Sequence, residues 1–86
     1  MKIMRFTADW CQPCKAVARL LTEVKTPAPI EVIDIDDKSE LAMKFKIRSV
    51  PTIMMVSSAD EEISRITGTI TKEKLESWLL QYESGT

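Results

Sequence analysis

Two cysteines stand close together near the start of the chain, and they are the only cysteines in its 86 residues. Cys11 and Cys14 enclose Gln12 and Pro13, which gives a Cys-x-x-Cys motif. A disulfide that closes so short a loop constrains the unfolded chain little and therefore adds little stability. Thiols at this spacing can instead open and close a disulfide, exchanging two electrons with the disulfide of another protein. The motif therefore predicts redox chemistry rather than a structural crosslink.

The segments on either side of the motif indicate how the cysteines are held. An apolar run over residues 2–7 is typical of a buried strand. After the motif, apolar residues recur at the i, i+3, i+4, i+7 spacing of a helix; they are Val17, Leu20, Leu21 and Val24. We expect this helix to run from about Gln12 to Lys25 and to stop at the following prolines.

A helix that begins at Gln12 makes Cys11 its N-cap residue. An N-cap side chain accepts a hydrogen bond from the second or third helical amide. The second position is Pro13, which has no amide hydrogen, so only the Cys14 amide is left to donate to the Cys11 sulfur. This bond and the positive end of the helix dipole favour thiolate over thiol. Cys11 is therefore the predicted nucleophile, and the more buried Cys14 is the predicted resolving cysteine.

Two residues inside the motif and one before it are expected to modify this chemistry. Pro13 limits the backbone adjustment between dithiol and disulfide, and Gln12 lies at the helix start beside the reactive sulfur, so both are expected to tune the redox poise. Trp10 is a large aromatic in a loop, which favours a lid and docking surface over a core position. Trp78 has helical spacing with Leu75 and Tyr82, which predicts core packing.

The rest of the chain predicts an α/β fold with the element order β-α-β-α-β-β-α. We expect three further strands over 30–35, 52–56 and 62–67, a short helix that opens at 37–40, and a last helix that begins at 71–74. The first two strands should be parallel with a right-handed crossover, and the last two antiparallel. The result is a four-stranded mixed sheet with helices on both faces, in one domain over residues 1–86.

Composition and charge argue against several classes of function. Twelve basic and thirteen acidic residues give a net charge of −1, which disfavours nucleic acid or an anionic membrane as the main partner. No apolar stretch approaches the ~20 residues needed to cross a bilayer, and the start has no signal-peptide pattern. We expect a cytoplasmic protein, in which a cysteine pair is catalytic or metal-binding rather than structural. With two cysteines and no histidine, a four-ligand zinc site would need a dimer that shares both pairs, so no metal is expected.

Nearly the whole chain resembles the thioredoxin family. The resemblance rests on the segments Trp10 to Lys15, Val32 to Asp36 and Phe45 to Thr52, and on Gly68 ahead of the last helix. It implies the thioredoxin fold and a redox-active disulfide, Cys11–Cys14, with no further cofactor. It also implies a cis peptide bond between Val50 and Pro51 that lies against the motif. Trp10, Val50, Pro51 and Gly68 are then the expected residues of a substrate-docking surface.

The chain departs from the family's pattern in three places. The usual first strand and helix are absent from the sequence, so the core should have the smaller size of glutaredoxins. Gln12 stands where thioredoxins usually carry Gly, and Arg5 stands at the place of the family's buried acidic residue. Arg5 could reach solvent along its alkyl stem, pair with Asp34 or Asp36, or point its charge toward Cys14.

The resemblance implies a protein-disulfide reductase recharged by a flavoprotein thioredoxin reductase. It also implies disulfide-containing client proteins such as ribonucleotide reductase. The chain is similar in size to the small thioredoxins of phages and archaea. We expect a monomer in the cytoplasm, which would be the host cytoplasm for a phage-encoded protein.

Two alternatives stay open. The first is a glutaredoxin-like protein recharged by glutathione. Glutaredoxins typically carry a Tyr inside the motif and a Gly-Gly near the last helix, whereas this chain has Gln12 and Pro13, and Gly68 followed by Thr69. The second is a non-enzymatic binding scaffold of the same fold, in which both cysteines are dispensable.

Overall fold

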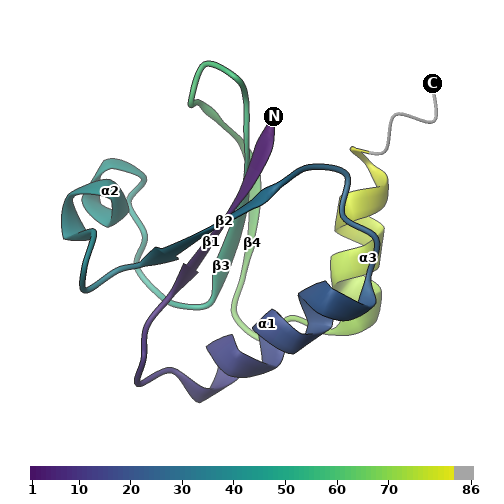
Figure 1. Ribbon diagram of the computed structural model, residues 1–86, viewed down its shortest axis with the longest axis horizontal. Helices are drawn as coiled ribbons and strands as arrows, with labels where there is room; N and C mark the ends of the chain where they lie inside the picture. The colour runs from purple at the N-terminus through teal and green to yellow at the C-terminus, as the bar shows by residue number, and fades with distance from the viewer. Residues whose placement is uncertain (83–86) are drawn as a thin grey trace.

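The computed structural model describes residues 1–82, and within them the chain forms four strands and three helices (Figure 1). In chain order these are β1 (Lys2–Thr7), α1 (Gln12–Glu23), β2 (Ile30–Asp34), α2 (Ser39–Lys44), β3 (Thr52–Val56), β4 (Glu62–Thr67) and α3 (Lys72–Leu80). The predicted element order β-α-β-α-β-β-α is confirmed.

The four strands form one mixed sheet in the order β2-β1-β3-β4. β1 pairs with β2 in parallel and with β3 antiparallel, so the strand that leads into the motif lies in the interior of the sheet. β4 pairs antiparallel with β3 at the edge. The helix between β1 and β2 is what allows these two strands to run in the same direction. The predicted pairing of the first two and of the last two strands is confirmed.

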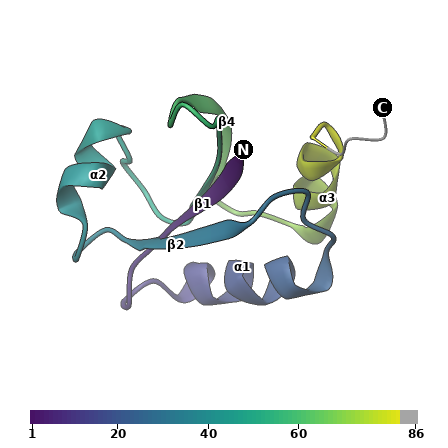
Figure 2. The ribbon, with the colours of Figure 1, turned by 45° about the horizontal axis from the view of Figure 1, so that its top comes forward.

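The helices cover both faces of the sheet. Successive side chains of a strand point to opposite faces, so Ile3 packs against α1 and α3 on one face, while Phe6 packs on the other. On that second face Phe6 meets Phe45, which follows α2, in an edge-on contact with ring centroids 6.2 Å apart. Figure 2 shows α1 and α2 on opposite sides of β2. The sheet is thereby buried between two apolar clusters.

Most predicted boundaries hold within two residues, and each difference has a local cause. α1 ends at Glu23 rather than Lys25, because Val24 already has the extended conformation φ −117°, ψ 155°. β2 ends at Asp34 rather than at residue 35, because the Asp34 carboxylate accepts a hydrogen bond of 2.8 Å from the Asp36 amide and turns the chain.

The last helix is capped by Thr71, whose hydroxyl accepts a hydrogen bond of 3.1 Å from the Lys74 amide. Trp78 lies on its inner face with 6% of its surface exposed, which confirms its predicted place in the core. Its indole nitrogen donates to the Ser64 hydroxyl at 2.9 Å, so the one polar group of this buried ring has a partner. No helix within residues 1–82 combines the length and apolarity that a bilayer crossing requires.

Candidate redox site

Cys11 is the N-cap residue of α1. Its backbone is extended, with φ −95° and ψ 103°, and its sulfur accepts a hydrogen bond of 3.2 Å from the Cys14 amide. Pro13 occupies the first turn, where its missing amide hydrogen leaves that turn one donor short. The arrangement predicted from the spacing of the motif is therefore present: one sulfur lies at the helix start and receives the amide of the other cysteine.

The two cysteines are joined by a disulfide, with their Cα atoms 5.3 Å apart. Both are buried, Cys11 with 4% and Cys14 with 1% of the surface exposed. The order of exposure is the predicted one, although the difference is small. A nucleophile that comes from outside meets Cys11 first, because Cys14 lies one turn inside the helix.

The disulfide lies in a small apolar cluster that three separate segments build. Ala8 comes from the loop after β1. The partly buried Ile35 directly follows β2, and the partly buried Val50 lies in the loop before β3. Val50 precedes Pro51, and the peptide bond between them is cis. The hydroxyl of the buried Thr52 donates to the Ser49 carbonyl at 2.8 Å and fixes this loop. The predicted docking residue Val50 thus lies against the disulfide, although it comes from a distant part of the sequence.

Trp10 lies on the surface beside the motif, with 68% of its area exposed. Its indole nitrogen donates to the Asp36 carboxylate at 3.2 Å. A loop position rather than a core position is therefore confirmed, while the docking role of Trp10 stays a prediction. The partner Asp36 was not predicted, since the sequence places it only as one of two aspartates after the second strand.

Arg5 is half-buried and lines a cavity of about 500 Å³ together with Cys14. Burial lowers the pKa of this guanidinium from its ordinary value. Among residues 1–82 it belongs to none of the ion pairs, so the alternative in which Arg5 pairs with Asp34 or Asp36 is wrong. The two carboxylates meet other donors instead: Asp34 accepts backbone amides of its own turn, and Asp36 accepts the Trp10 indole.

The positions of the remaining predicted site residues, Gln12, Pro13 and Gly68, are defined, whereas their roles stay predictions. Gln12 and Pro13 are exposed at the start of α1. Gly68 follows β4 with φ +80°, and a Cβ added there would meet nothing within 4 Å. The left-handed backbone, rather than lack of space, is therefore what favours glycine at this position.

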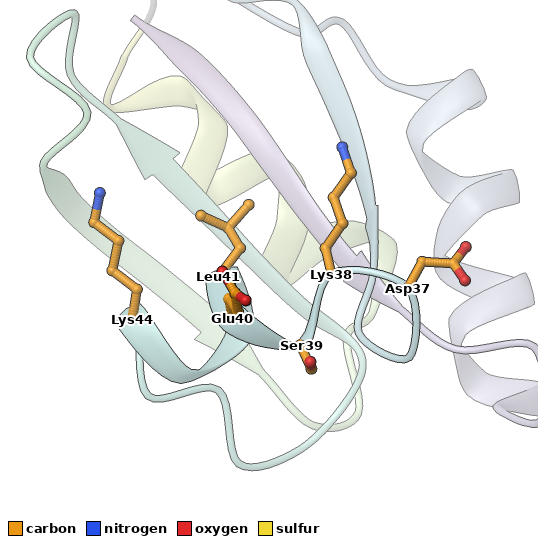
Figure 3. Close-up of a pocket in the computed structure, with 6 residues that line it drawn as sticks. All are labelled: Asp37, Lys38, Ser39, Glu40, Leu41 and Lys44. Atoms are coloured by element: carbon orange, nitrogen blue, oxygen red, sulfur yellow. The ribbon is translucent and has the colours of Figure 1, made fainter.

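A second cavity lies at α2 and has a volume of about 530 Å³ (Figure 3). Its lining comes from one stretch of chain: Asp37, Lys38, Ser39, Glu40, Leu41 and Lys44. It contains neither cysteine, so it offers no thiol chemistry. In the part of the chain that the structure describes, no three His, Cys, Asp or Glu side chains converge in a way that could hold a metal ion. The thiol chemistry is therefore confined to the start of α1.

Comparison with known proteins agrees with this geometry. The family model described as thioredoxin matches residues 1–81. A thioredoxin of Porphyra purpurea is 33% identical over 86 residues, covering 95% of this chain and 79% of the relative. A thioredoxin of Staphylococcus haemolyticus is 33% identical over 79 residues, covering 87% of this chain and 75% of the relative.

The fold agrees with solved structures as well. A mutant thioredoxin from Halobacterium salinarum superposes with a TM-score of 0.85 at 26% identity, covering 98% of this chain and 75% of that one. A mitochondrial thioredoxin of Saccharomyces cerevisiae, solved in its oxidized form, superposes with a TM-score of 0.79 at 24% identity, covering 92% of this chain and 76% of that one.

Proposed function

Since this chain belongs to the thioredoxin family and is a protein-disulfide oxidoreductase, we propose that it reduces client disulfides through Cys11 and Cys14 and is recharged by a flavoprotein thioredoxin reductase. The observation that carries the proposal is the hydrogen bond from the Cys14 amide to the Cys11 sulfur at the start of α1. The Cys11 sulfur thus receives a hydrogen bond and also lies at the positive end of the dipole of α1. Both effects favour the Cys11 thiolate.

The proposed cycle starts from the reduced pair. The Cys11 thiolate attacks one sulfur of the client disulfide, forming a mixed disulfide and releasing the first client thiolate. The Cys14 thiolate then attacks the Cys11 sulfur, forming the Cys11–Cys14 disulfide and releasing the second client thiolate. Two electrons have moved to the client, and the reductase returns the disulfide to two thiols. No cofactor beyond the disulfide takes part.

The surface around the disulfide supports a protein rather than a small molecule as substrate. Trp10 offers a large exposed aromatic face that is anchored at its polar edge by Asp36. Val50 lies on the disulfide cluster and has part of its surface accessible. An extended client segment can dock between these two side chains, with its own disulfide over Cys11. We expect a monomer that acts in the cytoplasm on clients of the ribonucleotide reductase kind.

Recharging by glutathione is the second candidate, and one experiment separates the two. The oxidised protein is mixed with a model protein disulfide and with either NADPH and thioredoxin reductase, or NADPH, glutathione and glutathione reductase. Sustained turnover with the first mixture and little with the second is expected. Turnover only with glutathione would replace the proposed reductase, and no turnover with either would support the non-enzymatic scaffold. A Cys11→Ser variant is the control for reduction that bypasses the site.

A further inference from the structure

One cavity on the α1 face of the sheet is lined both by Cys14, the proposed resolving cysteine, and by Arg5, a charged residue of the interior strand β1. The cavity has a volume of about 500 Å³ and lies where α1 crosses β1 and β2. Cys14 lines it from the first turn of α1, and Arg5 lines it from β1. Cys14 is only 1% exposed, so the wall of this cavity is a place where water comes close to an otherwise enclosed side chain.

Four charged side chains face this cavity, and they differ in how far their charge is compensated. Asp9 and Lys15 are exposed, so water and salt screen them. Asp34 lies on β2 and accepts hydrogen bonds from two backbone amides of the following turn. Arg5 is half-buried and, among residues 1–82, takes part in no ion pair. The amide donors of Asp34 are neutral and leave its negative charge in place, and Arg5 is the one half-buried cation among the residues that line the cavity.

The guanidinium is open to solvent. Among the described residues no fully buried side-chain nitrogen or oxygen lacks a hydrogen-bond partner, and none of the side-chain hydrogen bonds involves Arg5, so its nitrogens are not enclosed by protein. A cation that faces the same cavity as a thiol and forms no ion pair favours the thiolate. The Cys14 amide donates its hydrogen bond to the Cys11 sulfur, so this bond stabilises the thiolate of Cys11 and not that of Cys14.

We propose that Arg5 favours the thiolate of Cys14 across this cavity and thereby speeds the second step of the dithiol cycle. Arg5 acts as a positioning charge and does not touch the client. The kinetic part of this inference rests on the proposed function, whereas the effect on Cys14 itself does not.

The step that Arg5 assists is the attack of Cys14 on the mixed disulfide between Cys11 and the client, and it needs no reactant beyond these three sulfurs and solvent. The Cys14 thiol gives its proton to water in the cavity. Its thiolate sulfur then forms a bond to the Cys11 sulfur, and the bond between Cys11 and the client breaks. The client sulfur leaves with the electron pair of that bond and takes up a proton from solvent. The Cys11–Cys14 pair is oxidised, and the client disulfide has been reduced by two electrons.

The direct test is a titration of Cys14 alone. In a Cys11→Ser background, the ultraviolet absorbance of the thiolate is followed against pH for Arg5, Arg5→Met and Arg5→Lys. Arg5→Met removes the charge and keeps the apolar stem, so the thiolate fraction near neutral pH should fall roughly tenfold. Arg5→Lys should keep most of the effect. Arg19→Met is the matched control, because Arg19 is exposed on α1 and does not line the cavity.

The kinetic test uses the intact cysteine pair. In single turnovers with a model protein disulfide, the mixed disulfide of Arg5→Met should persist roughly tenfold longer than that of Arg19→Met. A Cys14 titration curve that is the same in Arg5→Met and Arg19→Met overturns the proposal, and an unchanged lifetime overturns its kinetic part. Arg5→Gln replaces Arg5→Met if the latter does not fold. The titration needs neither reductase nor client, so its outcome is independent of how the protein is recharged.

Discussion

The two cysteines differ in what the backbone offers their sulfurs. Cys11 stands before α1 and accepts the Cys14 amide, whereas Cys14 lies inside the first turn and is the more buried of the two. A residue at the N-cap also meets the positive end of the helix dipole, whose effect falls off within the first turn. From this asymmetry we predict that Cys11 attacks and that Cys14 resolves the mixed disulfide.

Replacing one cysteine at a time tests this assignment. Cys14→Ser keeps the attacking sulfur and loses the resolving one, so it should accumulate a mixed disulfide with a client through Cys11, detectable by mass spectrometry. Cys11→Ser should form little or none. In the reduced wild type, limited iodoacetamide near neutral pH should label Cys11 first. Preferential labelling of Cys14 would reverse the two roles.

Among the elements, α2 depends most on contacts outside itself. It has only six residues, and so short a helix gains little from its own hydrogen bonds. Arg65 of β4 donates to the carbonyl of Phe45, the residue that ends α2, at 2.6 Å. The same guanidinium holds both oxygens of Glu62, at 2.5 and 2.7 Å. The edge strand thereby ties the end of α2 to the sheet, on the face opposite α1.

This tie makes stability depend on pH. The hydrogen bond from Arg65 lowers the pKa of Glu62, burial opposes this effect, and the positive charge of Arg65 lowers the pKa further. A carboxylate whose pKa is lower in the folded than in the unfolded protein stabilises the folded state. This stabilisation is complete above the unfolded pKa of about 4.3 and is lost as the pH falls through the folded pKa. The two side chains are partly exposed, 27% for Arg65 and 33% for Glu62, so solvent still screens the pair and its contribution should be on the order of 1 kcal/mol.

Urea unfolding of the wild type and of Glu62→Gln from neutral to acid pH measures this contribution. The wild type should be more stable above pH ~5, and the difference should shrink as the pH falls below the unfolded pKa of about 4.3 and through the lower folded pKa. Glu61→Gln is the control, because Glu61 is the neighbouring exposed carboxylate and belongs to no ion pair among the described residues. A constant difference between wild type and Glu62→Gln at all pH values would exclude the carboxylate as its source.

For the molecule as a whole, stability depends on two apolar clusters that share one sheet. The larger cluster lies under α1 and α3, and the smaller one lies under α2. A chain of this size buries a smaller fraction of its surface than a larger domain does, so each core side chain carries a larger share of the stability.

Two leucines of α3 provide a matched pair for testing this dependence. Leu75 is fully buried, whereas Leu80 is 62% exposed. Leu75→Ala should lower the free energy of unfolding by about 2–5 kcal/mol, since it leaves a cavity. Leu80→Ala should change it by less than about 0.5 kcal/mol. Chemical denaturation of both variants gives the comparison, and equal losses would mean that α3 is not packed on the sheet as described.

What could be predicted from the sequence is what depends on near neighbours. The N-cap position of Cys11 follows from the spacing of the motif and from Pro13, and the strands follow from short apolar runs between turn residues. The contact between Trp10 and Asp36 could not be predicted, because 26 positions separate the two residues and only the sheet brings them together. The surroundings of Arg5 depend in the same way on three elements at once, so the sequence could only offer alternatives for it.

The apolar cover of the disulfide also has a consequence for the protein while it is being made. Ala8 and the two cysteines leave the ribosome early, whereas Ile35 and Val50, which complete the cluster, follow later in synthesis. β1 likewise waits for β3 before it has a neighbour on each side. During that interval the two thiols of a nascent chain lack the apolar neighbours Ile35 and Val50 that pack against them in the folded protein. The disulfide cluster therefore cannot be complete before residue 50 has been translated, so an oxidant meets the motif in a more open state during synthesis than after folding.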